Sequence, residues 1–228
     1  MKYLIVNGDD LGLSRGINRG ILQAHLHGIL TSASLLVDRP WSEEGAAMAR
    51  DVPRLSLGLH VDLNEHVRDA IRPELRRQLA RFEKLVGATP THLDSHHNVH
   101  RAPSVLPHFL AIAREYNLLL RDFSPARYVP DFYGQSCGRT HLPQISAAAL
   151  GHILKTKLHD GVTELGCHPG YVDVDLVSRY AAERECEVRT LCNPAVREAI
   201  REAGIILVSF RDIARLASDH AIPIRADR

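Results

Sequence analysis

The sequence predicts a single α/β domain spanning residues 1–228, built mostly from parallel strands. Segments with the pattern of buried strands alternate along the chain with segments of helical periodicity. A length of 228 residues and a hydrophobic content of 45% suffice for one sizeable core, and no shift of composition divides the chain. In such folds the functional side chains gather at the carboxyl ends of the strands, in a barrel or in an open sheet.

The predicted strands are short, mainly apolar runs that end in turn or polar residues. They cover Tyr3–Asn7, Thr31–Val37, Leu55–His60, Thr91–Ser95, Leu118–Arg121, Val162–Cys167 and Ile205–Ser209. The turn Gly8–Gly12 is expected to end the first strand, and it contains two adjacent acidic residues.

The predicted helices have apolar residues at helical spacing, and Ser14 and Gly28 are suitable residues to begin and end the first one. They cover Ser14 to about His27, Ser42–Arg50, Pro73–Val86, Pro103 to about Tyr116, Ile145–His159, Val177–Arg184, Pro194–Ala203 and Ile213–Ala217. Asp122–Leu142 has no clear periodicity and is predicted to be a long loop over the site. We expect residues 219–228 to form a loose tail.

Charge and cysteine content argue against several classes of function. Lys and Arg number 28 against 27 Asp and Glu, and no basic run suggests a nucleic-acid surface. No stretch approaches 18 apolar residues, so we expect no membrane span, and the first residues lack the features of an export signal. The four cysteines form no C-x-x-C pair and are expected to be reduced thiols of a cytoplasmic protein.

The segment Thr91–His100, T-H-L-D-S-H-H-N-V-H, contains four histidines and one aspartate. In a strand, the period of two puts His92, Asp94 and His96 on one face. Such a row has the nitrogen and oxygen donors that a borderline divalent cation binds. A polar strand end with solvated histidines is the alternative. Clustered histidines repel one another once protonated, however, and a bound metal keeps them neutral.

Two adjacent carboxylates, Asp9 and Asp10, follow the first predicted strand. Because neighbouring side chains in a loop diverge, one can bind a cation while the other acts as a general base beside a metal-activated water. A simple turn is the alternative, since aspartate is common in turns.

Two histidines and an arginine also stand at strand ends. His60 closes the third predicted strand, and Asp62 is a candidate to orient its imidazole. His168 precedes a Pro-Gly turn after the sixth strand, where it would suit protonation of a leaving amine. Arg121 ends the fifth strand. For each histidine taken alone, a hydrogen-bonded structural role is the alternative.

Five motifs resemble those of the YdjC family of carbohydrate deacetylases, which includes chitooligosaccharide deacetylases and hopanoid-associated deacetylases. They lie in order between Lys2 and Tyr171, and they read N-G-D-D-L-G-L-S-R-G-I-N-R-G-I, G-I-L-T-S-A-S-L-L-V, L-G-L-H-V-D-L, T-H-L-D-S-H-H-N-V-H and E-L-G-C-H-P-G-Y. The resemblance implies a distorted (β/α) TIM-like barrel, often dimeric, that hydrolyses the N-acetyl group of an amino sugar, oligosaccharide or glycolipid.

The resemblance also implies site roles, with one divalent metal ion held by Asp10, His60 and His96. Asp9 would be the catalytic base and His168 the acid. Arg121 resembles a family arginine near the site, with substrate binding as its expected role. Two histidines and a carboxylate suit Zn²⁺, and Mg²⁺ with several waters also stays open.

Two departures from the family pattern bear on the substrate. Asn98 stands where the pattern S-H-H-H-V-H has its third histidine, and the segment between His60 and Thr91 is short, which predicts a reduced covering loop. Two other functions stay open: a metal-dependent phosphoesterase or isomerase on a similar barrel, and a non-catalytic sugar- or metal-binding protein.

Overall fold

A computed structural model of the chain describes residues 1–63, 70–174, 176 and 178–218. Its main sheet has eight strands in the order β5-β4-β3-β2-β1-β9-β6, and β10 pairs with the first residues of β1. Every pairing in this sheet is parallel. Its strands are β1 (Lys2–Leu11), β2 (Ser32–Leu35), β3 (Ser56–Val61), β4 (His92–Ser95), β5 (Leu119–Leu120), β6 (Arg127–Val129), β9 (Gly161–Cys167) and β10 (Ile205–Leu207).

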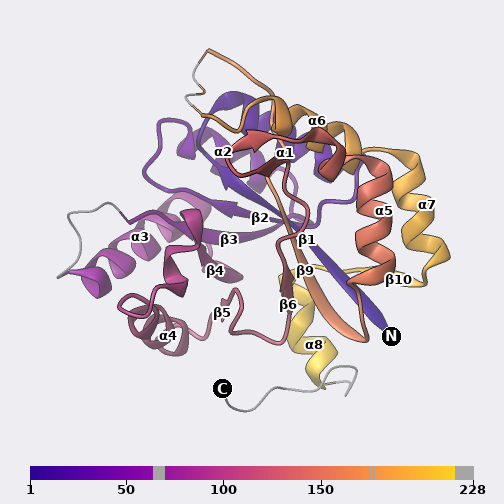
Figure 1. Cartoon of the computed structure of the whole chain (residues 1–228). Helices are drawn as coiled ribbons and strands as arrows, with labels where there is room; N and C mark the ends of the chain where they lie inside the picture. The colour runs from indigo at the N-terminus through magenta and orange to yellow at the C-terminus, as the bar shows by residue number, and fades with distance from the viewer. Residues whose placement is uncertain (64–69, 175, 177, 219–228) are drawn as a thin grey trace.

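Helices surround the curled sheet and connect most of its strands (Figure 1). They are α1 (Arg15–His27), α2 (Ser42–Arg50), α3 (Ile71–Val86), α4 (Leu106–Glu115), α5 (Ala147–Thr156), α6 (Ala182–Leu191), α7 (Pro194–Glu202) and α8 (Ile213–Ser218). Among the described residues β5 and β6, the ends of the strand order, do not pair with each other, so the barrel is open there. The predicted fold class, a distorted (β/α) barrel with mostly parallel strands, is confirmed.

The central strands are buried on both faces, as parallel strands covered by helices must be. Every residue of β2 and β3 is buried, and so is β1 after Lys2. Helix α1 packs Ile17 and Ile21 into the same core. The Ser14 hydroxyl accepts a hydrogen bond from the Ile17 N–H at 3.2 Å, which confirms the predicted cap. A cap of this kind stabilises a protein by about 1 kcal/mol.

The prediction that β1 ends before the two aspartates is wrong. The strand continues to Leu11, and its pairing with β2 shifts register between Gly8 and Leu11. Asp10 has a φ of 73°, in the left-handed region that aspartate tolerates better than most residues. The aspartates therefore lie in an irregular part of a buried strand rather than in an exposed turn.

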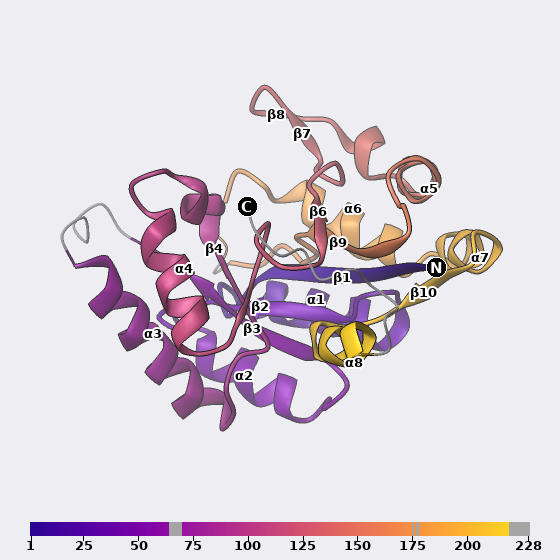
Figure 2. The same cartoon turned by 90° about the horizontal axis from the view of Figure 1, so that it is seen from below.

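Two further predictions need correction. The segment predicted as a loop, Asp122–Leu142, contains β6 of the main sheet. It also contains an antiparallel hairpin, β7 (Gln135–Ser136) and β8 (Arg139–Thr140), which extends away from the sheet (Figure 2). The helix expected at Val177–Arg184 is α6, which begins at Ala182 and ends at Leu191. Three predicted regions lie partly or wholly outside the described residues. They are Val177, the predicted tail 219–228, and residues 64–69 of the short segment between His60 and Thr91.

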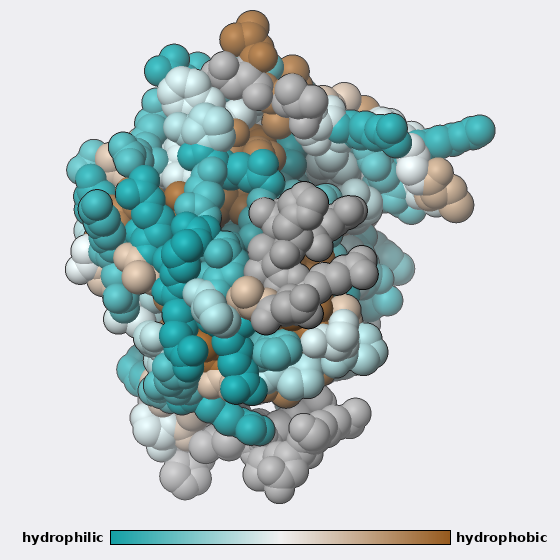
Figure 3. All heavy atoms as spheres, turned by 90° about the vertical axis from the view of Figure 1, so that its left-hand side faces the viewer, coloured by the Kyte–Doolittle hydropathy of each residue, from teal (hydrophilic) through white to brown (hydrophobic). Residues whose placement is uncertain are grey.

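The surface beside α3 is rich in ion pairs. Arg76 lies 2.8 Å from Glu115, and Arg81 lies 2.7 Å from Glu43. The face of the molecule that includes α3 is accordingly mostly hydrophilic (Figure 3). Across the described part of the chain, none of the helices combines the length and apolar character needed to cross a bilayer.

Candidate functional site

A cavity of about 660 Å³ opens at the carboxyl ends of the strands. This volume is in the range that holds a small organic ligand. Asp9, Asp10, His60, His96 and His168 all line it. The structure therefore brings together five candidate residues that come from β1, from β3 and from the segments directly after β4 and β9. Arg121, the sixth candidate, does not line the cavity.

The two adjacent aspartates point to different partners. Both Asp9 oxygens accept hydrogen bonds from the Arg121 guanidinium, each at 2.8 Å, and Asn7 donates a further bond at 2.8 Å. One Asp10 oxygen, Oδ2, accepts a bond from Arg184 at 2.7 Å. Burial alone would raise the pKa of each aspartate, but the charge of its arginine and the neighbouring donor groups together lower it. Both carboxylates are therefore ionised at neutral pH.

The second oxygen of Asp10 has the surroundings of a metal ligand. Oδ1 is buried without a hydrogen-bond partner. It lies 3.4 Å from Nε2 of His60 and 3.1 Å from Nδ1 of His96. One ligand atom from each of these three residues lies within 4.8 Å of the other two. The site lines an open cavity and offers two nitrogens and one oxygen, so these residues fit one divalent cation with room for further ligands.

Asp94 supports this group from behind. Its Oδ1 accepts a hydrogen bond from Nδ1 of His60 at 2.7 Å, which leaves Nε2 of His60 directed towards Asp10. Burial alone would lower the pKa of His60, but the charge of Asp94, the nearby Asp10 carboxylate and the hydrogen bond to Asp94 raise it to about 10. The expectation that Asp62 orients His60 is wrong, because Asp62 pairs with Arg39 instead.

A second set of donors, Asp9, His60 and Asp94, is also close together. Its atoms are already occupied, however, since His60 donates to Asp94 and Arg121 contacts both aspartates. The group Asp10, His60 and His96 is therefore the better candidate for a metal site.

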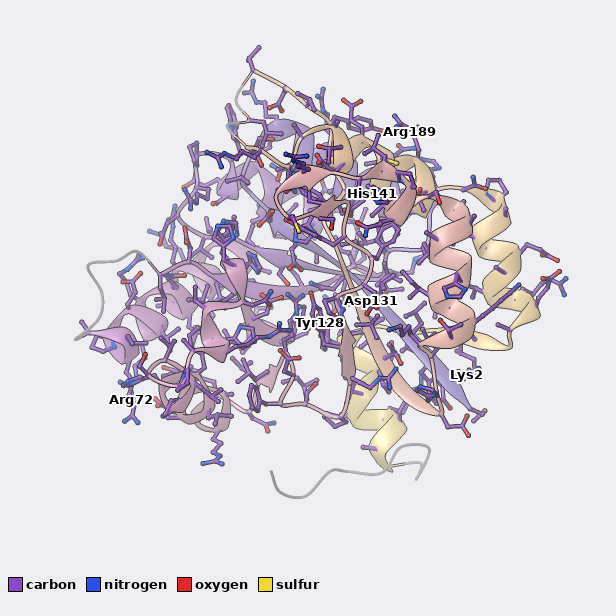
Figure 4. The ribbon with its side chains drawn as sticks, viewed as in Figure 1. Lys2, Arg72, Tyr128, Asp131, His141 and Arg189 are labelled. Carbon is purple, nitrogen blue, oxygen red and sulfur yellow. The ribbon has the colours of Figure 1, made fainter. Side chains whose placement is uncertain are left out.

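Arg121 is completely buried and is surrounded by carboxylates. Besides Asp9, its guanidinium lies 2.8 Å from Asp94 and donates to Glu164 at 2.7 Å. The Arg121 guanidinium also lies over the Tyr128 ring, with its Cζ 4.7 Å from the ring centroid. Tyr128, which is labelled in Figure 4, extends from β6 in the middle of the molecule. Arg121 is thus placed to hold Asp9 from beneath the cavity, and it has no direct access to a ligand.

His168 also lies near Asp9, on the wall of the cavity. Its Nε2 is 3.9 Å from Asp9 Oδ2, and about a quarter of the side chain is exposed. Burial lowers the pKa of His168, and the charges of Asp9 and Asp10 oppose this only in part. The imidazole is therefore neutral at neutral pH and able to accept a proton.

Helix α6 holds His168 through two charged residues that the sequence analysis did not single out. Arg184 donates to the His168 carbonyl oxygen at 3.3 Å and also bonds Asp10. Glu187, one turn further along, accepts the His168 N–H and the Tyr180 hydroxyl. Burial raises the pKa of Glu187 to about 8. Three residues apart on a helix, Arg184 and Glu187 share a face and connect the candidate metal site to His168.

The remaining members of the histidine cluster have different surroundings. His92 is fully buried and stacks on Phe210 with a centroid separation of 3.7 Å, so it is not part of the cavity. His100 is also buried and bonds the Ser95 hydroxyl at 2.6 Å. His97 and Asn98 line the cavity with left-handed backbone, φ 55° and 53°. Asparagine adopts this conformation more readily than most residues, which fits its presence at position 98.

Known proteins resemble this chain over most of its length. The model of the family described as "YdjC-like protein" matches residues 3–70 and 64–202. The chain belongs to the YdjC-like family. Among the relatives of this YdjC-like chain, a protein from Geobacillus stearothermophilus named carbohydrate deacetylase is 36% identical, covering 94% of this chain and 99% of the relative. A chitooligosaccharide deacetylase from Serratia marcescens is 33% identical, over 93% of this chain and 99% of its own.

Solved structures resemble the YdjC-like chain over almost its whole length. A proposed cellobiose-phosphate cleavage protein from Enterococcus faecalis has a TM-score of 0.82 and 28% identity, covering 93% of this chain and 98% of its own. A family 4 acetyl xylan esterase from Clostridium thermocellum, solved with a cobalt ion, has a TM-score of 0.59 and 15% identity, covering 95% and 92%. The second likeness shows the shared fold.

Proposed function

We propose that this chain is a metal-dependent carbohydrate deacetylase, a hydrolase that removes the N-acetyl group of an amino sugar. The observation that carries the proposal is the convergence of Asp10, His60 and His96 around an unpartnered carboxylate oxygen, with Asp9 and His168 beside it. The names of the relatives support the carbohydrate substrate and the reaction.

In this proposal Asp10, His60 and His96 hold the cation. When bound there, a divalent cation supplies Lewis acidity, which makes water easier to deprotonate and polarises a carbonyl oxygen. Two imidazole nitrogens and one carboxylate favour Zn²⁺ or a similar borderline ion over Mg²⁺, which prefers oxygen ligands. Asp94 fixes the tautomer of His60 so that Nε2 is free to coordinate.

Asp9 acts as the general base. Its carboxylate takes a proton from water while the water oxygen attacks the acetamide carbon, and Arg121 and Asn7 hold it in position. Arg121 is therefore a positioning residue, in place of the substrate-binding role expected from the resemblance. Its burial beneath Asp9 supports this change.

His168 acts as the general acid. As the C–N bond breaks, it gives a proton to the departing amine, which leaves as the free amino sugar while acetate retains the acyl group. His168 is neutral before the reaction and needs a proton first. The gap of 3.9 Å between its Nε2 and Asp9 allows the proton taken up by Asp9 to be passed on after a small movement.

The test is acetate release from N-acetylglucosamine oligomers, measured for protein loaded with Zn²⁺ and for protein treated with a chelator. Chelation should abolish the activity, and Zn²⁺ should restore it. General acid and base steps each contribute about 10²- to 10⁴-fold, so Asp9→Asn and His168→Ala should lose roughly that much in kcat while still binding metal. The matched controls are Asp38→Asn and His152→Ala, because both of these residues are exposed. Acetate release that survives chelation would contradict the proposal.

A further inference from the structure

Tyr133 is an unusually exposed aromatic side chain for the wall of a polar cavity. It precedes the β7–β8 hairpin and lines the cavity, with 42% of its surface exposed. Its ring is close to His168, with 5.8 Å between the centroids. The proposed chemistry gives Tyr133 no role, so its exposure beside the proposed general acid needs another explanation.

The inner face of Tyr133 is supported by a fixed partner. Its ring stacks on Tyr180 with a centroid distance of 4.7 Å and an angle of 16° between the planes. The Tyr180 hydroxyl accepts the Gly134 N–H at 2.7 Å and donates to buried Glu187. Because its ring and its hydroxyl are both held, Tyr180 gives Tyr133 a rigid support.

The backbone beside Tyr133 is equally constrained. A Cβ added at Gly134 would lie 2.7 Å from Ile145 Cδ1 and 2.9 Å from Glu183 Cγ, so the chain packs there without space for a side chain. The hairpin is anchored to α6, since both Gln135 and Thr140 donate to Glu183. The position of Tyr133 is therefore set before any ligand binds.

The outer face of Tyr133 is left to the cavity. The ring centroids of Tyr133, Tyr180 and His168 are separated by 4.7, 5.5 and 5.8 Å, which is nearly an equilateral triangle. Both partners therefore lie towards the same side of Tyr133. A flat ring fixed on one side and open on the other has the geometry of a stacking surface.

We propose that Tyr133 is a platform on which one pyranose ring of the substrate stacks through its C–H face. The inference rests on the proposed function and adds the residue that positions the sugar. Ring C–H groups carry a small positive charge, and the face of an aromatic ring is negative, so the two attract in addition to their apolar contact. A sugar on the open face of Tyr133 would occupy the same cavity that His168 and Asp9 line.

The test compares Tyr133→Ala and Tyr133→Phe with wild type, using the N-acetylglucosamine disaccharide as the probe. Aromatic contacts of this kind are worth about 0.5–1.5 kcal/mol, so Tyr133→Ala should weaken disaccharide binding and raise KM by about 2- to 12-fold, with kcat nearly unchanged. Tyr133→Phe keeps the ring and should stay within about twofold of wild type. Phe123→Ala, which removes an aromatic ring with 44% exposure outside the cavity, is the matched control.

Binding is measured by calorimetry as well as by acetate release, which separates this inference from the proposed function. If wild type binds the disaccharide without releasing acetate and Tyr133→Ala binds it more weakly, the platform stands and the deacetylase proposal fails. If Tyr133→Ala binds as tightly as wild type, or lowers kcat at constant KM, the platform is refuted. Failure of the wild type to bind the sugar at millimolar concentration refutes it too. Melting curves check that each variant is folded.

Discussion

Replacing Arg121 with methionine should destabilise the protein strongly, because this side chain is the shared partner of three buried carboxylates. Its guanidinium contacts Asp9, Asp94 and Glu164, and both Arg121 and Asp94 are completely buried. Removing one partner of a buried ion pair typically costs about 3–5 kcal/mol, since the other charge is left without compensation. For a chain of this size each kcal/mol lowers Tm by about 2–4 °C, so the expected fall is about 6–20 °C.

The pH dependence of this effect is a sharper test than its size. Arg121 lowers the pKa of Asp9 and of Asp94 against the opposing effect of burial. Lowered carboxyl pKa values contribute stability above the unfolded pKa, about 3.9, and that contribution is lost as the pH falls towards the folded value. The stability difference between wild type and Arg121→Met should therefore be largest at neutral pH and should narrow as the pH falls below about 4.

Urea unfolding followed by circular dichroism measures both quantities, with chelator present so that metal binding does not contribute. Arg76→Met is the matched control, because Arg76 forms two hydrogen bonds with Glu115 at the surface. Both of those side chains are nearly half exposed, so the control should cost far less stability than Arg121→Met. Arg121→Lys keeps a charge without the planar fork and should fall between them. A loss under about 1 kcal/mol for Arg121→Met, or a pH-independent difference, would refute the reasoning.

Three other predictions concern single side chains. Asp94→Asn should weaken Zn²⁺ binding about 10- to 100-fold in a competition titration, because it weakens support for the proposed ligand His60; unchanged affinity would argue against that ligand set. His92→Gln should remove part of the acid sensitivity of unfolding. Burial lowers the pKa of His92 to about 4, so wild type loses about 3 kcal/mol of stability as the pH falls from 6.5 to 4, and parallel curves would disprove this. Gly20→Ala should destabilise the protein by about 1–3 kcal/mol, because its Cβ would lie 2.4 Å from a backbone Cα. Gly151→Ala, which adds its Cβ in open space within a helix, should stabilise it by up to about 1 kcal/mol. Changes in Tm of the same sign for both variants would contradict the packing argument.

Local signals in the sequence were sufficient for most helices and for the central strands. Helix α2 has the predicted bounds, and α1 begins at the predicted cap, because capping and periodicity are properties of neighbouring residues. Strand β6 was missed for the opposite reason. Its three residues, Arg127–Val129, form a strand only through pairing with β9, a contact with a segment about 35 residues away that no local pattern encodes.

Helix α6 was misplaced because buried charged residues conceal its amphipathic pattern. Glu183, Arg184 and Glu187 are buried alongside Val188 and Leu191. In the sequence A-E-R-E-C-E-V-R these charges have the pattern of a solvated face. The same concealment explains why Arg184 and Glu187 were not recognised as part of the site. Their significance depends on the fold, which brings them to Asp10 and His168.

The charges around the two arginines give an independent reason to expect a cation at Asp10. Arg121 contacts three carboxylates and Arg184 contacts that of Asp10, so two positive groups face four acidic ones in the interior. An excess of buried negative charge is costly unless a cation compensates it. Without a metal, the raised pKa of His60, about 10, keeps a compensating proton on its imidazole, and a divalent ion bound there would take the place of that proton. The atom left without a partner is Asp10 Oδ1, and it faces two imidazole nitrogens. The two arginines thus separate the roles of the adjacent aspartates. Asp9 is held in place as a base by three hydrogen bonds, while Asp10 keeps one oxygen available for a divalent ion.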